Sequence, residues 1–94
     1  MLRWLAVYDV ADNRRRLRLA GVLDDFGDRV QNSVFEMLLE QDELPLVKER
    51  IAEAINPLED KVRLYPLCDA CGKKVVDFGP FERKAFDEPE VIVV

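Results

Sequence analysis

The sequence of 94 residues predicts an α+β domain, in which one four-stranded antiparallel sheet carries two helices on one face. Apolar runs with strand-like alternation recur along the chain, and two segments between them carry apolar residues at helical spacing. The composition is 49% hydrophobic, which is typical of a globular chain rather than a disordered one.

The first strand is expected over residues 2–10. Its apolar side chains point to both faces of the sheet, Leu5 and Val7 to one and Trp4, Ala6 and Tyr8 to the other. Asp12 is a suitable N-cap for a helix over residues 13–26. The apolar stripe of this helix consists of Leu19, Val22, Leu23 and Phe26. We expect Gly27 to end it.

The second strand is expected over residues 29–40, where β-forming residues again occupy both faces. Asp42 should cap a second helix with Pro45 in its first turn. The buried stripe of that helix is expected to be Leu44, Val47, Ile51, Ala54 and Ile55. A third strand over residues 61–68 and a short fourth over residues 73–79 follow.

The order that we expect is β-α-β-β-α-β, that of a ferredoxin-like domain formed by residues 1–80. Residues 81–94 should form a linker and a C-terminal strand. Because the strands are apolar on both sides and the helices cover only one, we expect a second copy of the chain to cover the other. The final apolar run, with Val91, Ile92 and Val93, should extend the sheet of that partner, since an unpaired apolar strand promotes aggregation.

Charge is unevenly distributed. The net charge is −5, yet residues 1–30 carry six arginines against five carboxylates, and the remainder carries eight basic and fourteen acidic residues. Four of the arginines lie within one predicted helical stretch: Arg14, Arg15, Arg16 and Arg18. Arginine suits bidentate contact with phosphate, although a charged helix face can also be merely solvated.

Histidine is absent, so imidazole cannot serve as a general base or metal ligand. Cys68 and Cys71 form a single CxxC, which is too few ligands for a zinc site within one chain. A redox pair normally begins a longer helix, and Gly72 follows directly, so we expect these cysteines to be turn or core residues without a metal. No apolar run approaches the roughly 18 residues of a membrane span, and no signal peptide fits, so we expect a cytoplasmic protein.

Three motifs stand in order along the chain: "VYDV" at the end of the first strand, D-x-x-D-N-R-R-R at the start of the first helix, and "RVQNSVFE" in the second strand. Together with "LYPLC" further on, they resemble the CRISPR-associated Cas-two family over nearly the whole chain. This family accompanies the CRISPR integrase in spacer acquisition.

The resemblance implies a homodimer packed sheet to sheet and a metal-dependent endonuclease that cleaves RNA or DNA. Asp9 matches the metal-binding aspartate of the family and Tyr8 the aromatic residue before it, so both are candidate catalytic residues. The two Asp9 of the dimer would share one Mg²⁺ or Mn²⁺.

The resemblance also matches Arg16, Arg18 and Arg29 to basic positions of the family. With the rest of the arginine run, the expected nucleic-acid contacts are Arg14, Arg15, Arg16, Arg18 and Arg29. Phe35 is expected at the interface, near the dimer axis or the site rather than in contact with substrate, whereas the role of Asn32, which replaces a common tyrosine, stays open. An alternative is a non-catalytic adaptor that bridges the integrase and binds prespacer duplex DNA. A ferredoxin-like RNA-binding module is weaker, because residues 61–68 lack an aromatic platform.

Overall fold

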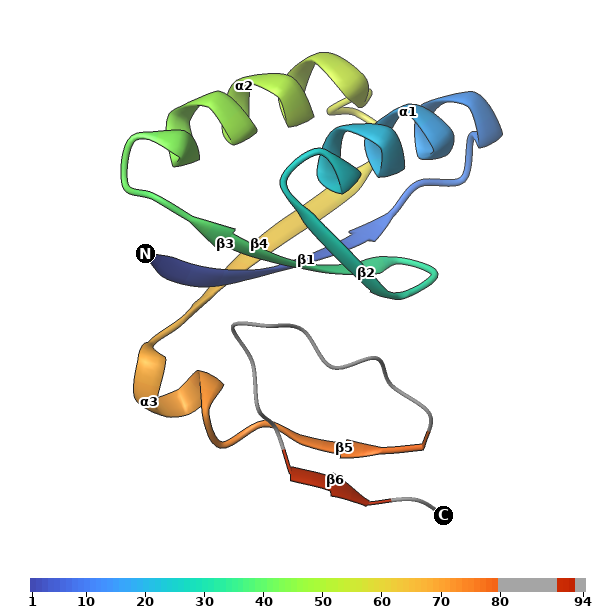
Figure 1. Cartoon of the computed structure of the whole chain (residues 1–94). Coiled ribbons are helices and arrows are strands. Elements are labelled where there is room, and N and C mark those ends of the chain that lie inside the picture. Colours follow the sequence, from blue (N-terminus) through green and yellow to red (C-terminus); the bar gives the residue numbers. More distant parts are fainter. Residues whose placement is uncertain (80–89, 93–94) are drawn as a thin grey trace.

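The computed structural model describes residues 1–79 and 90–92. It contains one four-stranded antiparallel sheet in the order β2-β3-β1-β4, with α1 and α2 on one face (Figure 1). The expected α+β, ferredoxin-like fold is confirmed. Within the described residues, no helix is long and apolar enough to cross a membrane.

The two inner strands are β1 (Leu2–Asp9) and β3 (Val34–Leu39). Strand β1 pairs antiparallel with β3 on one side and with β4 (Lys61–Leu67) on the other. The alternation of side chains directs one set toward the helices and the other toward the opposite side, which we call the open face. Leu5 and Val7 lie on the open face and are half-buried.

The segment predicted as one strand over residues 29–40 is instead a hairpin of two strands. Strand β2 (Gly27–Gln31) turns at Asn32 and Ser33 into β3. The turn contains neither Gly nor Pro, and its only turn-forming residues are Asn32 and Ser33 themselves, within a continuous run of strand-forming residues. The hairpin supplies the adjacent strand pair that the β-α-β-β-α-β order requires.

Helices α1 (Asn13–Asp24) and α2 (Glu43–Ala54) bury the predicted stripes against the sheet. Asp12 caps α1 as expected, because its carboxylate accepts a hydrogen bond from the Arg15 N–H at 2.9 Å. Asp42 occupies the N-cap position of α2 but makes no side-chain cap bond. The buried core comprises Ala6, Tyr8, Val10, Leu19, Ala20, Val22, Leu23, Phe35, Met37, Leu39, Val47, Ile51 and Ala54.

Gly27 does not end α1, which stops at Asp24 with Asp25 as its C-cap. It is instead the first residue of β2, where its backbone passes close to β3. A Cβ at this position would collide with the carbonyl oxygen of Glu36. The glycine is therefore required by a close approach of two strands rather than by a helix terminus.

The expected fourth strand lies outside the main sheet. Strand β5 (Val76–Phe78) pairs in parallel with β6 (Glu90–Ile92) of the same chain, and a short helix, α3 (Asp69–Gly72), connects β4 to β5. Figure 1 shows α3, β5 and β6 on the side of the sheet away from α1 and α2. Val91 and Ile92 thus belong to β6, whereas Val93 lies outside the described residues.

Candidate active site and nucleic-acid interface

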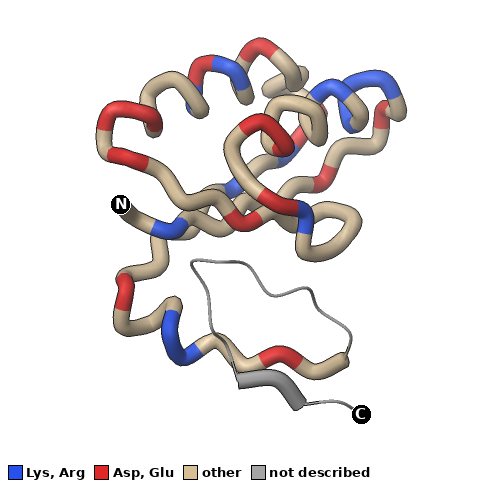
Figure 2. Tube along the Cα trace, in the orientation of Figure 1, with Lys and Arg blue, Asp and Glu red and all other residues tan. Residues whose placement is uncertain are grey.

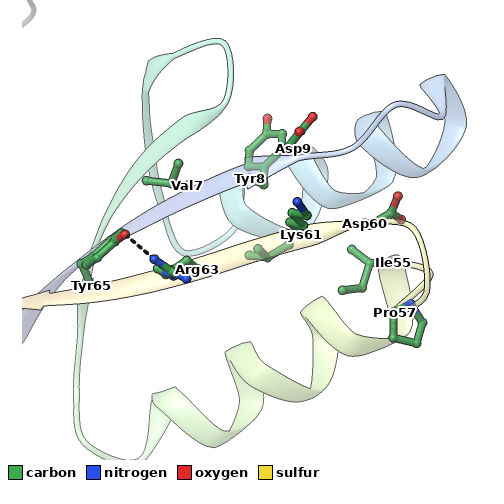
Figure 3. Close-up of a pocket in the computed structure, with 10 residues that line it drawn as sticks. Val7, Tyr8, Asp9, Ile55, Pro57, Asp60, Lys61, Arg63 and Tyr65 are labelled. Carbon is green, nitrogen blue, oxygen red and sulfur yellow. Dashed lines mark hydrogen bonds between the residues drawn. The ribbon is translucent and has the colours of Figure 1, made fainter.

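Asp9 is the last residue of β1 and is exposed. Its cross-strand partner is Lys61, the first residue of β4. Both residues line a pocket of about 580 Å³ at this end of the sheet (Figure 3). A carboxylate at the end of a central strand is therefore held on a rigid element and faces solvent, as a group that contacts a substrate must.

Tyr8 also lines the pocket but is 4% exposed and belongs to the core. Its hydroxyl donates to the carbonyl oxygen of Asn32 at 2.9 Å, and its N–H donates to the carbonyl oxygen of Ser33 at 3.1 Å. Both bonds hold the β2–β3 turn beside the end of β1. The hydroxyl of Tyr8 is thus engaged in holding the turn, which favours a positioning role over the expected catalytic one. Asn32 contributes its backbone carbonyl to this arrangement.

The Arg15 guanidinium forms hydrogen bonds with two carboxylates, those of Asp60 and Glu59. Its Nε donates to Asp60 Oδ2 at 2.7 Å, and its Nη2 donates to Asp60 Oδ1 at 3.2 Å and to Glu59 Oε2 at 2.9 Å. The Asp60 side chain is 1% exposed. The hydrogen bonds from Arg15, followed by one from the backbone of Asn56, hold the pKa of Asp60 below its usual value.

This geometry corrects the assignment of Arg15 as a nucleic-acid contact. A guanidinium in bidentate contact with a buried carboxylate cannot grip phosphate without leaving that carboxylate unpaired. The pair also neutralises Asp60. Of the two carboxylates that line the pocket, Asp9 is therefore the one that is not paired with Arg15.

Arg16 is exposed but bound to its own neighbourhood. Its Nη1 donates to the carbonyl oxygens of Val10 at 3.3 Å and Ala11 at 3.4 Å, and its Nη2 donates to Asn13 Oδ1 at 2.6 Å. These bonds stabilise the loop between β1 and α1, directly after Asp9. Arg16 therefore stabilises this loop, and its guanidinium remains exposed to solvent.

Arg14 and Arg18 are exposed on α1 and form no ion pair with a carboxylate of residues 1–79 or 90–92. They stand four residues apart and so lie on one helix face. Figure 2 shows basic residues gathered in the N-terminal half of α1. These two side chains are accessible, and their role as phosphate contacts stays a prediction.

Arg29 and Phe35 occupy opposite positions of the β2–β3 pair, with the guanidinium 5.2 Å from the ring centroid. Arg29 is exposed, whereas Phe35 is 1% exposed and packs beside Tyr8 on the helix-covered face. The single chain already buries this ring, beside a residue that lines the pocket. That Phe35 lies near the dimer axis or the site stays a prediction. The Arg29 guanidinium makes a cation–π contact with the Phe35 ring and remains exposed to solvent.

Two further residues of the pocket, Arg63 and Tyr65, were not identified from the sequence. They follow Lys61 at alternate positions of β4, so the three side chains share one face. Arg63 Nη1 donates to the Tyr65 hydroxyl at 3.1 Å, and this bond raises the pKa of Arg63 above its usual value (Figure 3). The alternation K-x-R-x-Y over residues 61–65 was the available sign.

The accessible charges of the pocket are thus one carboxylate, Asp9, and two cations, Lys61 and Arg63. This balance suits a phosphate group. Among the described residues there is no group of three or more His, Cys, Asp or Glu side chains that could hold a metal ion. With Asp9 as the one accessible carboxylate among the lining residues, a divalent cation there would draw further oxygen ligands from a second copy or from the substrate.

Comparison with known proteins agrees with the geometry. The profile of the family "CRISPR associated protein Cas2" matches residues 1–75. The chain is 45% identical to "CRISPR-associated endoribonuclease Cas2 2" of Synechocystis over 97% of both sequences. It is 37% identical to "CRISPR-associated endoribonuclease Cas2 4" of Rhodospirillum rubrum, over 99% of this chain and 75% of that protein.

Solved structures give the same result. The structure of Streptococcus pyogenes Cas2 superposes with a TM-score of 0.66 and 34% identity, over 69% of this chain and 84% of that one. A chain of the partial Cas6-RT-Cas1–Cas2 complex superposes with a TM-score of 0.70 and 31% identity, over 78% of this chain and 86% of that one. By fold and by sequence, this chain belongs to the Cas2 family of CRISPR-associated proteins.

Proposed function

We propose that this chain is the Cas2 subunit of CRISPR spacer acquisition and a metal-dependent endonuclease whose centre forms from Asp9 of two copies. The observation that carries the proposal is the exposed Asp9 carboxylate in a pocket where Asp60 is neutralised by Arg15 and where Lys61 and Arg63 supply positive charge. Relatives named endoribonucleases and an endonuclease support the activity.

The homodimer is supported by the open face of the sheet. Leu5, Val7, Val34 and Leu38 lie there and are only half-buried in the single chain, and Tyr65 is 43% exposed. A second copy packed on this face would bury them further. It would also place another Asp9 on the same side of the assembly, and β6 is proposed to take part in this contact.

The residues of the chain have distinct tasks in this arrangement. Lys61 and Arg63 bind the phosphates that flank the scissile bond. Arg14 and Arg18 grip the backbone farther away, along α1. Mg²⁺ or Mn²⁺ held by the paired carboxylates would supply charge stabilisation and a bound water of lowered pKa.

A second candidate function is that of an adaptor without chemistry. A single accessible carboxylate per chain at the pocket favours it, because efficient phosphodiester cleavage normally uses more metal ligands. The similar chain in the complex with Cas1 supports an integrase partner for either function. In both, the dimer works in the cytoplasm, bound to duplex DNA and to the integrase.

Asp9→Asn separates the two functions, with Asp42→Asn as the control. The control removes one exposed carboxylate at the opposite end of β1, where Leu2 pairs with Leu39. We expect Asp9→Asn to lower Mg²⁺-dependent cleavage of single-stranded RNA or duplex DNA by more than about a hundredfold. Unchanged cleavage would contradict the nuclease centre. Lost cleavage with normal spacer acquisition would show that the adaptor is the cellular role.

A further inference from the structure

Cys68 and Cys71 stand outside the pocket at Asp9, at the point where β4 passes into α3. Both thiols are exposed and neither is in a disulfide. The sequence suggested turn or core residues because Gly72 follows at once. The structure instead gives a strand, then Cys68 as N-cap, then one helical turn that contains Cys71. The turn brings the two exposed cysteines of one CxxC motif together, which is a setting in which thiols become reactive.

The hydrogen bonding makes the two thiols unequal. Cys68 Sγ accepts the backbone N–H of Cys71 at 3.3 Å. This bond, followed by one from the Cys71 thiol, lowers the pKa of Cys68 below its usual value, although the nearby Asp69 acts in the opposite direction. The Cys71 pKa is raised, mainly because its thiol donates to Cys68.

The charged surroundings also differ from those of a buried structural cysteine. Lys73 and Lys74 follow α3 directly and are exposed. On the other side of the turn, the Arg3 guanidinium packs against Gly72, where an added Cβ would lie 2.5 Å from its Nη1. The two lysines close to the pair in sequence favour an anionic reaction partner, whereas Asp69 opposes the thiolate.

We propose that Cys68 and Cys71 form a reactive thiol pair that closes to an intramolecular disulfide with a small-molecule disulfide as oxidant. The Cys68 thiolate attacks one sulfur of the small molecule, forms a mixed disulfide and releases the other half as a thiolate. Cys71, after loss of its proton to water, attacks Cys68 Sγ and expels the second half. The protein loses two hydrogens, and the small disulfide is reduced to two thiols.

Oxidised glutathione is the probe for this reaction, and intact-mass measurement is the readout. The wild-type chain should lose two hydrogens and remain a single chain on a non-reducing gel. Cys71→Ser should instead accumulate one glutathionyl group on Cys68, because the resolving thiol is missing. Cys68→Ser keeps a capping side chain and should stay mainly reduced.

A second measurement compares the two thiols in the reduced wild-type protein. At neutral pH and limiting iodoacetamide, Cys68 should be alkylated more than about fivefold faster than Cys71, as shown by peptide mass spectrometry. Equal rates, a stable glutathione adduct on the wild-type chain, a covalent dimer, or one zinc per chain would each overturn the proposal. Circular dichroism of each variant verifies that α1 and α2 are intact.

Discussion

Arg15 and Asp60 join the start of α1 to the start of β4, and this pair shows how one residue can be misassigned from sequence. Arg15 stands in a run of arginines that suggests phosphate binding, but its partner lies 45 residues further along the chain. Nothing local indicates that a carboxylate with a 1% exposed side chain will meet it. The role of Tyr8 was also hard to predict, because the acceptor of its hydroxyl hydrogen bond is the carbonyl oxygen of Asn32, in a turn far along the chain.

Arg15→Ala should lower the thermal midpoint of unfolding, because it leaves Asp60 buried without its guanidinium. Arg14→Ala, the neighbouring control, removes an exposed arginine and should change the midpoint little. The pKa of Asp60 is lowered in the folded state, so its contribution is present at neutral pH and is lost as pH falls below the ordinary aspartate value of about 3.9.

The difference in stability between wild type and Arg15→Ala should therefore be largest near neutral pH and shrink in acid. Thermal or urea unfolding monitored by circular dichroism at several pH values measures it. A difference that grows toward acid would show that the Arg15–Asp60 contact does not stabilise the fold.

At the scale of the elements, two glycines predict opposite effects of the same substitution. Gly27→Ala should destabilise the protein by about 1–3 kcal/mol, since the added Cβ meets the backbone of Glu36. Gly21→Ala should stabilise it by nearly 1 kcal/mol, because Gly21 lies inside α1 with no neighbouring atom within 4 Å of an added Cβ. Urea unfolding of both variants tests this pair. If Gly27→Ala left stability unchanged, β2 and β3 would not approach as closely as described.

Helix α1 carries the nucleic-acid prediction. Arg14→Ala and Arg18→Ala should each weaken binding across sequences and reduce the slope of log K against log[salt] by about 0.9 on duplex DNA. Lys48→Ala, which removes an exposed cation from α2, is the control. Fluorescence anisotropy at several salt concentrations gives the slopes. If both arginine variants bound as tightly as wild type, this face of α1 would be merely solvated.

The helices were predictable because their stripes are periodic: Leu19, Val22 and Leu23 are buried as their spacing requires. The β2–β3 hairpin was not predicted, since strand-forming residues continue through both strands and the turn consists only of Asn32 and Ser33, without Gly or Pro. The position of Asp9 at the end of β1 was predicted from local order alone, whereas Arg63 and Tyr65 required the pairing of β4 with β1.

At the scale of the whole molecule, the proposed nuclease centre is incomplete in one chain and should depend on two. A heterodimer with one wild-type and one Asp9→Asn subunit tests this, if two affinity tags are used to isolate it from both homodimers. When each centre needs both Asp9 carboxylates, its Mg²⁺-dependent cleavage should fall close to that of the doubly substituted dimer. A heterodimer with Asp42→Asn in one subunit is the matched control and should cleave as wild type does.

Light scattering must first show that the tagged proteins are dimers and that the substitution leaves the association intact. The two mechanisms then differ in one number, the activity of the heterodimer relative to wild type. Retention of half the activity would mean that each subunit cleaves independently, with oxygen ligands from the substrate in place of the partner's carboxylate. Activity far below half, together with unchanged DNA binding, would place the two Asp9 side chains in one shared centre.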